Sequence, residues 1–397
     1  MRILGLIVEY NPLHLGHIYH INEAKKLIDP ELTIAVMSPH VVQRGDFSLI
    51  DKFTRTDWAL AHGIDLVIEL PSLFVLQSAD QFAKAAIHLL AHIGVTDLVF
   101  GSEHGDIEHL NRLVDLLENE AFQAHVRQSL DEGKSYASAH GLAFEQFTQS
   151  DQNAPNDTLG VHYLKAIRSL NVPIKSQTIK RQQTGYHDPY DPTKTIQSAS
   201  AIRAHVKRQM PVEHSVSKLV HDDLLRLPYL SLDKFEDALK VVLGRSEAED
   251  LEALFSVEEG LEHRLLDQPF TGSLETYLEA LKTPRYTYAK LRRTLMHVLL
   301  NTKKTLLQEP LPPYLRVLGM TAKGQAHLNR VKKTLTLPLI TKIQREKHPY
   351  LAYELRVTTV YESVARKNLV RREFAPARRT ALKDPLKSAI MNAGDKK

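Results

Sequence analysis

Residues 3–20 read Ile-Leu-Gly-Leu-Ile-Val-Glu-Tyr-Asn-Pro-Leu-His-Leu-Gly-His-Ile-Tyr-His, and this stretch decides the fold. The apolar run at 3–8 predicts a buried strand, and Asn11-Pro12 predicts a turn after it. From Ile18 onward apolar residues recur at helical spacing, so a helix begins directly after His14-Leu-Gly-His17. Two imidazoles and a glycine therefore lie where a strand leads into a helix N-terminus.

This position suits a phosphate group. A helix N-terminus offers free N–H groups and the positive end of the helix dipole, and Gly16 lets the backbone approach a ligand closely. His14 and His17 can donate hydrogen bonds to phosphate oxygens, more strongly if they become protonated. Two surface histidines near a helix start are the alternative, and the strand–turn–helix context argues against it.

The composition is that of a globular enzyme. The chain has 397 residues, enough for two or three domains, with 43% hydrophobic and 25% charged residues. It has no cysteine, which excludes disulfides, thiolate metal sites and cysteine nucleophiles. The N-terminus leads straight into a predicted strand without a signal-peptide pattern, and there is no run of 18 apolar residues. We therefore expect a cytoplasmic protein that does not enter a membrane.

The charge is unevenly distributed along the chain. Residues 312–397 hold 19 Lys and Arg against 6 Asp and Glu, a net charge of +13, and residues 1–311 carry −9. An acidic body with a basic C-terminal quarter favours a polyanion partner. The alternative is a solvated basic tail without a partner, and the residues from Ala375 on read as a flexible basic tail.

Strand and helix patterns alternate over the first 100 residues. This alternation predicts a parallel sheet with helices on both faces, in which ligands bind at the C-terminal ends of the strands. The predicted strands are 2–8, 32–37, 64–70 and 96–100, and the predicted helices are about 17–28, 52–62 and 79–93. The strand ends that this rule selects are Asn11–His17, Ser38–Asp46, Pro71–Ser72 and Gly101-Ser102-Glu103.

Three cations follow the second predicted strand. Arg44 lies in a polar loop, and Lys52 and Arg55 lie one turn apart near the start of a helix, so they can point the same way. We interpret the three as contacts for a triphosphate or a small carboxylate. The alternative for each is a solvent-facing salt bridge.

A second candidate phosphate site lies near residue 200. Ile196-Gln-Ser-Ala-Ser-Ala-Ile-Arg203 places serines at a helix start, with Arg203 one turn in, which predicts a second phosphate cradle. In isolation the same pattern is an ordinary helix cap. Before it, Asn156 and Asp157 are natural N-cap residues, and a predicted strand at 172–179 ends in Lys180-Arg181.

These motifs carry a resemblance. H-x-G-H followed about 185 residues later by Ser198–Arg203 is similar to the motif pair of the nucleotidylyltransferase superfamily, and the chain more closely resembles the bacterial tRNA(Met) cytidine acetate ligase family. Pro39-His40 and Asp157 depart from the pattern of that family. The other matching segments are Ile7–His17, Val42-Gln-Arg-Gly45 with Asp51-Lys52, Phe100-Gly-Ser-Glu103, Pro155-Asn156 with Leu159-Gly160, Arg181 with Gly185-Tyr-His-Asp188, Arg285–Arg293, and Val317–Met320 with Lys323-Gly324.

The resemblance implies a Rossmann-like nucleotidylyltransferase domain and an ATP-dependent ligase. Acetate would be activated as acetyl-adenylate and transferred to N4 of the wobble cytidine of elongator tRNA(Met), with tRNA, acetate and ATP as partners. His14 and His17 would be catalytic. Mg²⁺ would accompany ATP, and we expect no metal site on the protein itself. The implied ATP-binding residues are Ile7, Val8, Glu9, Tyr10, Asn11, Pro12, Leu13, His14, Leu15, Gly16, His17, Ile18, Tyr19, His20, Gly101, Asn156, Arg181, Ser198, Ser200 and Arg203.

We expect three regions. Residues 1–210 would form the adenylation domain, 211–311 a helical domain, and 312–397 a small basic α/β module that binds tRNA and includes a long basic helix at about 350–371. Aromatic and basic residues suit unpaired bases and phosphates. The expected tRNA contacts are Arg285, Tyr288, Lys290, Arg292, Arg293, Arg371 and Arg372. If the regions act separately, removing 312–397 abolishes acetyl transfer but spares adenylation.

Two other classes of protein remain open. A small-molecule adenylyltransferase of the pantetheine-phosphate or nicotinamide-nucleotide type shares both phosphate motifs, but it leaves the helical half and the basic module unexplained. A non-catalytic RNA-binding protein explains the basic end, but it leaves both motifs without a role. The oligomeric state does not follow from the sequence.

Overall fold

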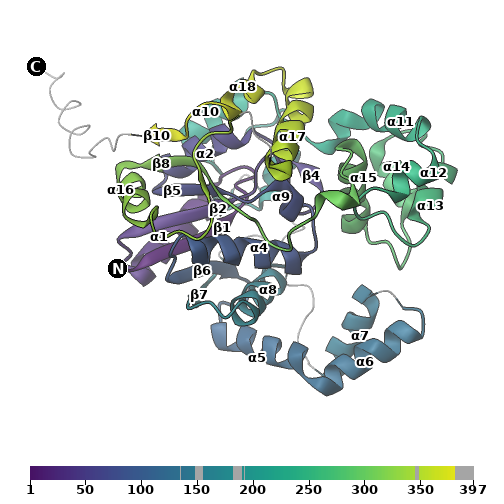
Figure 1. The fold of residues 1–397 in the computed structure, drawn as a ribbon, viewed down its shortest axis with the longest axis horizontal. Helices are drawn as coiled ribbons and strands as arrows, with labels where there is room; N and C mark the ends of the chain where they lie inside the picture. The colour runs from purple at the N-terminus through teal and green to yellow at the C-terminus, as the bar shows by residue number, and fades with distance from the viewer. Residues whose placement is uncertain (135, 148–154, 182–189, 192, 345–347, 381–397) are drawn as a thin grey trace, which may run out of the picture.

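The computed structural model describes residues 1–134, 136–147, 155–181, 190–191, 193–344 and 348–380. Its centre is a mostly parallel sheet in the order β10-β8-β5-β2-β1-β6-β7, with β9 paired to β8 (Figure 1). Gly185–Asp188 and the basic tail beyond 380 lie outside the described residues. The strands of this sheet are β1 (Ile3–Val8), β2 (Leu32–Met37), β5 (Leu66–Glu69), β6 (Asp97–Ser102), β7 (Lys175–Lys180), β8 (Leu315–Thr321), β9 (Leu339–Ile340) and β10 (Arg378–Thr380).

The predicted α/β fold is confirmed, because the first four predicted strands are β1, β2, β5 and β6 of a parallel arrangement. Ile34 and Val36 of β2 enter one hydrophobic core, and Ala35 and Met37 enter the other. A strand covered on both faces is apolar at every position, which is why β2 reads as a continuous apolar run.

Helices cover both faces of the sheet. The core on one face is built from α1, α2, α9 and α10, and the core on the other from α3, α4, α5, α8 and α17. None of the helices in the described part of the chain is long and apolar enough to cross a membrane. The bounds of these helices are α1 (Leu15–Ile28), α2 (Lys52–Ala61), α3 (Ser72–Val75), α4 (Ala79–His92), α5 (Ile107–Glu118), α8 (Pro155–Ser169), α9 (Ala199–Lys207), α10 (Lys218–Arg226) and α17 (Pro349–Ala365).

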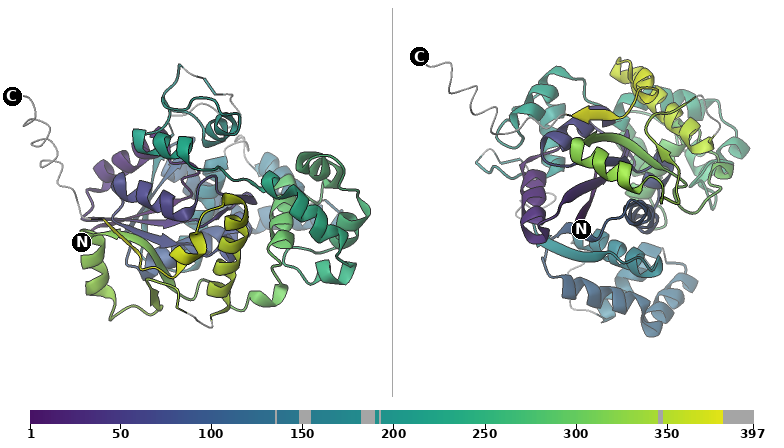
Figure 2. Two further views of the ribbon diagram at one scale, coloured as in Figure 1. Left: turned by 90° about the horizontal axis from the view of Figure 1, so that it is seen from above. Right: turned by 60° about the vertical axis from the view of Figure 1, so that its left-hand side comes forward.

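Two helical groups project from this body (Figures 1 and 2). The smaller consists of α6 (Glu120–Asp131) and α7 (Tyr136–Phe147), which pack together next to α5. The larger confirms the all-helical pattern predicted after residue 211, although α10 belongs to the body because Val220 lies in its core. Its members are η1 (Leu232–Phe235), α11 (Glu236–Gly244), α12 (Ala248–Glu252), α13 (Leu261–Asp267), α14 (Leu274–Leu281), α15 (Tyr288–Leu299) and η2 (Lys304–Leu306).

The C-terminal segment that begins at residue 312 does not form the separate basic module that the sequence suggested. β8 pairs antiparallel with β5 and β10 pairs with β8, so the segment widens the main sheet. α16 (Ala322–Val331) and α18 (Leu369–Glu373) belong to the same segment. The expected long basic helix is two helices, because α17 ends at Arg366 in the left-handed conformation with φ of 50°. All seven residues of β8 are buried, but their apolar pattern does not reveal which strand they pair with.

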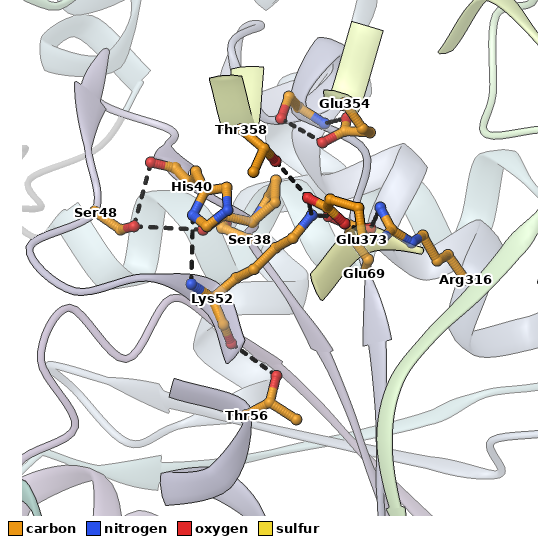
Figure 3. A network of polar contacts seen from close by, with 12 residues as sticks. Ser38, His40, Ser48, Lys52, Thr56, Glu69, Arg316, Glu354, Thr358 and Glu373 are labelled. Carbon is orange, nitrogen blue, oxygen red and sulfur yellow. Dashed lines mark hydrogen bonds and ion pairs between the residues drawn. The ribbon is translucent and has the colours of Figure 1, made fainter. Parts of the chain in front are cut away.

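A buried ion network joins this segment to the body (Figure 3). Lys52 of α2 lies 2.5 Å from Glu69 of β5 and 2.9 Å from Glu373 of α18. Arg316 of β8 lies 2.6 Å from Glu69 and also pairs with Glu373. Two buried cations and two buried carboxylates thus balance one another, and they tie segments that are more than 240 residues apart in the sequence.

A fifth ionisable group borders this network. Burial, and then the neighbouring Glu69 carboxylate, raise the pKa of Glu354 to about 8. Its carboxyl oxygens accept from the backbone N–H and the hydroxyl of Ser72, at 2.5 and 2.8 Å. Glu354 is therefore mostly protonated at neutral pH, which keeps the buried cluster close to zero net charge.

Candidate active site

The first motif forms a self-capped helix start. His14 is the N-cap of α1, and its Nδ1 accepts a hydrogen bond from the backbone of Gly16 at 3.1 Å. The backbone N–H of His14 in turn donates to Nδ1 of His17 at 3.3 Å, and the two ring centroids are 3.8 Å apart. Because both Nδ1 atoms accept, each neutral ring carries its proton on Nε2, which is free to act as a donor.

The histidines of this motif are neutral. Burial, followed by the charges of Arg181 and Arg203, lowers the pKa of His14 to about 3. Burial and the neighbouring cationic groups lower the pKa of His17 well below its usual value, and that of His20 to about 4. The protonated form considered from the sequence is thus disfavoured until a polyanion adds negative charge beside the rings.

The second motif contacts the first directly. Arg203 of α9 donates to the backbone oxygen of Asn11 at 2.8 Å. The Asn11 side-chain oxygen accepts from the backbone N–H of Leu49 at 2.7 Å. The backbone N–H of Leu15 donates to the backbone oxygen of Ser215 at 2.9 Å. The turn that places His14 is therefore held by three segments distant in the sequence.

The serines of the second motif cap α9. Ser198 is the N-cap and accepts from the backbone of Ala201 at 3.1 Å, and its hydroxyl lies 3.0 Å from that of Ser200. Arg203 lies one turn into the same helix. Two helix N-termini, of α1 and α9, are thus joined through the contact of Arg203 with Asn11.

Gly101 lies in β6, and Arg181 directly follows β7, the neighbouring strand. A Cβ added at Gly101 would be 3.2 Å from Cγ of Arg181 and 4.0 Å from the His20 ring. The absence of a side chain therefore lets the Arg181 side chain lie over the strand. Its guanidinium donates to the Asn156 side chain at 2.5 Å. This places Gly101, Arg181 and Asn156 together, beside the histidines of α1.

Glu103 and Asp157 organise this wall, a role that the sequence reasoning missed. Glu103 accepts from the backbone of Asn156 at 3.2 Å and of Asp157 at 2.9 Å, and it also accepts from the Asn156 amide. Asp157 accepts from the backbone of Glu103 at 2.8 Å and pairs with His104. The signals in the sequence were the strand-end position of Glu103 in a segment that matches the family, and the position of Asp157 as a possible N-cap that departs from the family pattern.

Arg44 belongs to a turn that is bonded to Glu9, the residue after β1. It lies in the turn between β3 (Val41–Val42) and β4 (Asp46–Phe47), two short strands that the sequence did not predict. The backbone of Gln43 donates to the Glu9 side chain at 2.8 Å. Burial lowers the pKa of Arg181; the Glu103 carboxylate partly offsets this effect, and the positive charge of Arg44 adds a smaller lowering.

Lys52 and Arg55 differ from their expected role as ligand contacts. Both are fully buried, and Lys52 belongs to the ion network. Arg55 donates to the backbone oxygens of Ile50 at 2.9 Å and Ser38 at 3.1 Å, and also to those of Glu9 and Pro39. The two side chains satisfy buried carboxylates and carbonyls, because a polar loop enclosed by the fold needs internal donors.

The expected tRNA contacts on α15 and before it fall into two groups. Arg285 is exposed, 3.5 Å from Glu259, and Lys290 lies 5.3 Å from the ring of Tyr286, which is itself buried. The others face neighbouring structure. Tyr288 donates to Glu275 at 2.5 Å, Arg292 pairs with Asp46 at 2.7 Å, and the backbone of Arg293 packs against Gly45.

The two expected contacts on α18 also differ from each other. Arg371 is exposed. Arg372 lies 3.8 Å from Asp51, with its guanidinium 4.5 Å from the Phe53 ring. The structure does not gather all seven residues on a free surface: Arg285 and Arg371 are exposed, Lys290 and Arg372 are partly exposed, and the others face neighbouring structure.

The arrangement is suited to an anion with several negative charges. Two imidazole donors, two helix N-termini and the guanidinium groups of Arg181 and Arg203 come together at the carboxyl ends of β1 and β6, and Arg44 lies on the turn bonded to Glu9. The part of the chain that the structure describes contains no group of three His, Asp or Glu side chains arranged to hold a metal ion.

Comparison with known sequences agrees with this geometry. The HIGH Nucleotidyl Transferase family model matches residues 1–375. The tRNA(Met) cytidine acetate ligase of Bacillus licheniformis is 40% identical over 384 residues, which cover 91% of this chain and 92% of that protein. The ligase of the same name from Leuconostoc citreum is 42% identical over 359 residues, 87% of this chain and 88% of that protein.

Solved structures of related proteins also match the fold of this chain. The crystal structure of apo Thermotoga maritima TmcAL has a TM-score of 0.87 and 31% identity, covering 96% of this chain and 100% of that chain. TmcAL bound with alpha-thio ATP has a TM-score of 0.85 and 30% identity over the same shares. The chain therefore belongs to the HIGH nucleotidyl transferase family and, within it, to the family of the tRNA(Met) cytidine acetate ligases.

Proposed function

We propose that this protein is an ATP-dependent ligase that acetylates N4 of the wobble cytidine of elongator tRNA(Met) in the cytoplasm. The observation that carries the proposal is the contact of Arg203 with Asn11, which joins the two phosphate motifs of a nucleotidyl transferase into one site. Relatives that carry the ligase name match nearly the whole chain, and a relative of known structure has been crystallised with an ATP analogue.

In the first step an acetate oxygen attacks the α-phosphorus of ATP. The new O–P bond forms as the bond to pyrophosphate breaks, which yields acetyl-adenylate. Negative charge develops on the α-phosphate and on the leaving group, and donors already aimed at that position lower the barrier. His14 and His17 would donate from Nε2 to the α-phosphate, while Ser198, Ser200 and Arg203 would hold the β- and γ-phosphates.

The opposite wall would hold the rest of the substrate. Gly101 leaves room over β6, and Arg181, fixed by Asn156, would supply a cation on that side. Mg²⁺ would arrive with the phosphates of ATP, because it keeps several waters and needs few protein ligands. Glu103 and Asp157, the nearest carboxylates of this wall, are already engaged with backbone N–H groups and His104.

In the second step the exocyclic N4 of cytidine attacks the acetyl carbonyl carbon. The C–N bond forms, AMP leaves with the electrons of the C–O bond, and N4 loses one proton. The tRNA would approach across the exposed Arg285 and Arg371 and the partly exposed Lys290. Binding through phosphates should weaken steeply as the salt concentration rises, since each neutralised phosphate releases counterions.

Nucleoside mass spectrometry tests the whole proposal. The protein is incubated with ATP, isotopically labelled acetate and elongator tRNA(Met), and the tRNA is then digested. Labelled N4-acetylcytidine is the expected product. Pyrophosphate release with pantetheine phosphate or nicotinamide mononucleotide, but not with acetate, would identify a small-molecule adenylyltransferase instead. Tight tRNA binding without any ATP turnover would identify a non-catalytic RNA-binding protein.

A further inference from the structure

The turn at Gln43–Gly45 bridges the candidate active site and the helical region. On one side, the backbone of Gln43 donates to the Glu9 side chain at 2.8 Å. Glu9 directly follows β1 and precedes the turn that holds His14. A displacement of Gln43–Gly45 would therefore shift Glu9 and, with it, the turn that holds the first phosphate motif.

On the other side, the turn rests on the backbone of α15. Gly45 has φ of +76°, and a Cβ added there would lie 2.4 Å from the backbone nitrogen of Arg293 and 2.6 Å from the carbonyl carbon of Arg292. Only glycine fits, both because of its positive φ and because of this contact. The two surfaces meet with no space for a side chain between them.

An ion pair fixes this contact. Arg292 lies 2.7 Å from Oδ2 of Asp46, and their side chains are only 16% and 25% exposed. Oδ1 of Asp46 accepts from the backbone of Leu232 at 2.6 Å, so both carboxylate oxygens are held by the helical region. A half-buried pair with both oxygens engaged is restrained far more than an exposed pair on a surface.

Arg44 lies in the turn between the contact with Glu9 on one side and the contact with α15 on the other. It follows Gln43, whose backbone is bonded to Glu9, and precedes Gly45, which packs on the backbone of α15. The positive charge of Arg44 also contributes to the lowered pKa of Arg181, the guanidinium that donates to Asn156. Two cations in one cluster repel each other, and an anion placed between them removes that cost. The attachments of the turn thus decide where one of the cations of the site lies.

We propose that Arg292 is a positioning residue for the adenylation step, acting through Asp46 and Gly45 to hold Arg44 against the anionic substrate. This inference rests on the proposed function. It replaces the expected role of Arg292 in tRNA binding, because its guanidinium is paired with Asp46. A residue that contacts only tRNA has no effect on a reaction without tRNA, whereas a positioning residue does.

The test is acetate-dependent ATP–pyrophosphate exchange in the absence of tRNA, with the full-length protein. Arg292→Ala should raise the KM for ATP or lower kcat/KM by roughly 10- to 100-fold, the scale of a small misplacement of a reacting group. Arg292→Lys should recover part of the loss, since lysine can still reach a carboxylate. Arg245→Ala removes an exposed arginine at the end of α11 and should leave exchange unchanged.

A double variant shows whether Arg292 acts through Arg44. If it does, Arg292→Ala should cause little further loss in an Arg44→Ala background. Multiplying losses would overturn the inference, because a merely structural residue weakens every variant alike. Thermal melting accompanies each assay. If Arg292→Ala does not fold, Asp46→Asn breaks the same pair while its oxygen can still accept from Leu232.

The two hypotheses fail in different ways. Exchange in the wild-type protein that persists unchanged in Arg292→Ala refutes the positioning role and leaves the proposed function intact. No acetate-dependent exchange in the wild-type protein refutes the proposed function and this inference together. A fall in exchange with Arg292→Ala and Asp46→Asn, but not with Arg245→Ala, supports both.

Discussion

Replacing Glu373 by glutamine tests whether the buried ion network supports the fold. Glu373 lies 2.9 Å from Lys52, contacts Arg316 and accepts from Thr358. Glutamine keeps the shape but removes the charge, so two buried cations then face Glu69 as the only ionised carboxylate. Arg316 and Lys52 hold the pKa of Glu373 well below its usual range, so the wild-type group is charged at every working pH.

The expected loss of stability follows from the burial of Glu373. Removing one partner of a buried ion pair costs about 3–5 kcal/mol. The unfolding entropy of about 2.1 cal/mol/K per residue, applied to 397 residues, converts this cost to a fall in Tm of roughly 4–6 °C. Part of the cost is recovered if Glu354 ionises in compensation; because the loss of the Glu373 charge lowers the pKa of Glu354 below its wild-type value of about 8, this recovery should begin at a lower pH than in the wild-type protein.

Thermal unfolding followed by circular dichroism measures the effect at pH 7. Glu309→Gln, an exposed change of the same chemistry, is the matched control and should shift Tm by less than about 1 °C. Arg316→Met combined with Glu373→Leu should be less damaging than the sum of the two single changes, because it leaves the Lys52–Glu69 pair intact. A Glu373→Gln protein with the Tm of the control would refute the reasoning.

Four further outcomes are expected. His17→Ala should leave Tm nearly unchanged and lower acetate-dependent ATP–pyrophosphate exchange by roughly 10²-fold or more; near-wild-type exchange would remove His17 from the site. Arg181→Ala should raise the KM for ATP more than the Kd for tRNA, and the opposite order in binding assays would contradict its placement. Glu354 has a raised pKa in the folded protein, so it binds a proton that the unfolded chain releases, and stability should fall by up to about 1.4 kcal/mol per unit as the pH rises from about 5 to 8. Glu354→Gln should flatten that dependence in chemical denaturation at several pH values; an unchanged slope would assign it to other groups. Removing 312–397 should unfold the body rather than spare adenylation, and a truncated protein with native circular dichroism would contradict this.

The body of the fold could be predicted because its signals are local. The apolar runs at 3–8 and 32–37 are β1 and β2, and the motif at His14–His17 starts α1 as expected. β3 and β4 were missed because strands of two residues have no measurable periodicity. The sequence-based reading brought His14 and Arg203 to one site only through the family pattern, and the contact of Arg203 with Asn11 gives that pairing a physical basis.

The C-terminal quarter was harder, because its pairing is long-range. Its excess of positive charge suggested an external polyanion. However, Arg316 pairs with Glu69, Lys367 with Asp51 and Arg378 with Asp57, so part of that charge neutralises the acidic body. The same charges in a sequence fit a tRNA surface or an internal interface, and only the positions of their partners distinguish the two.

The pairing of β5 with β8 also bears on how the protein is made. About 250 residues separate these strands in the chain, so at roughly 5–20 residues per second the ribosome needs about 12–50 s to complete the pair. During that time β5 has β2 on one side and an open edge on the other, with Glu69 still lacking Arg316. Open edges recruit other strands. We therefore expect nascent chains to depend on chaperones until β8 emerges, and products of premature termination to aggregate rather than accumulate as folded fragments.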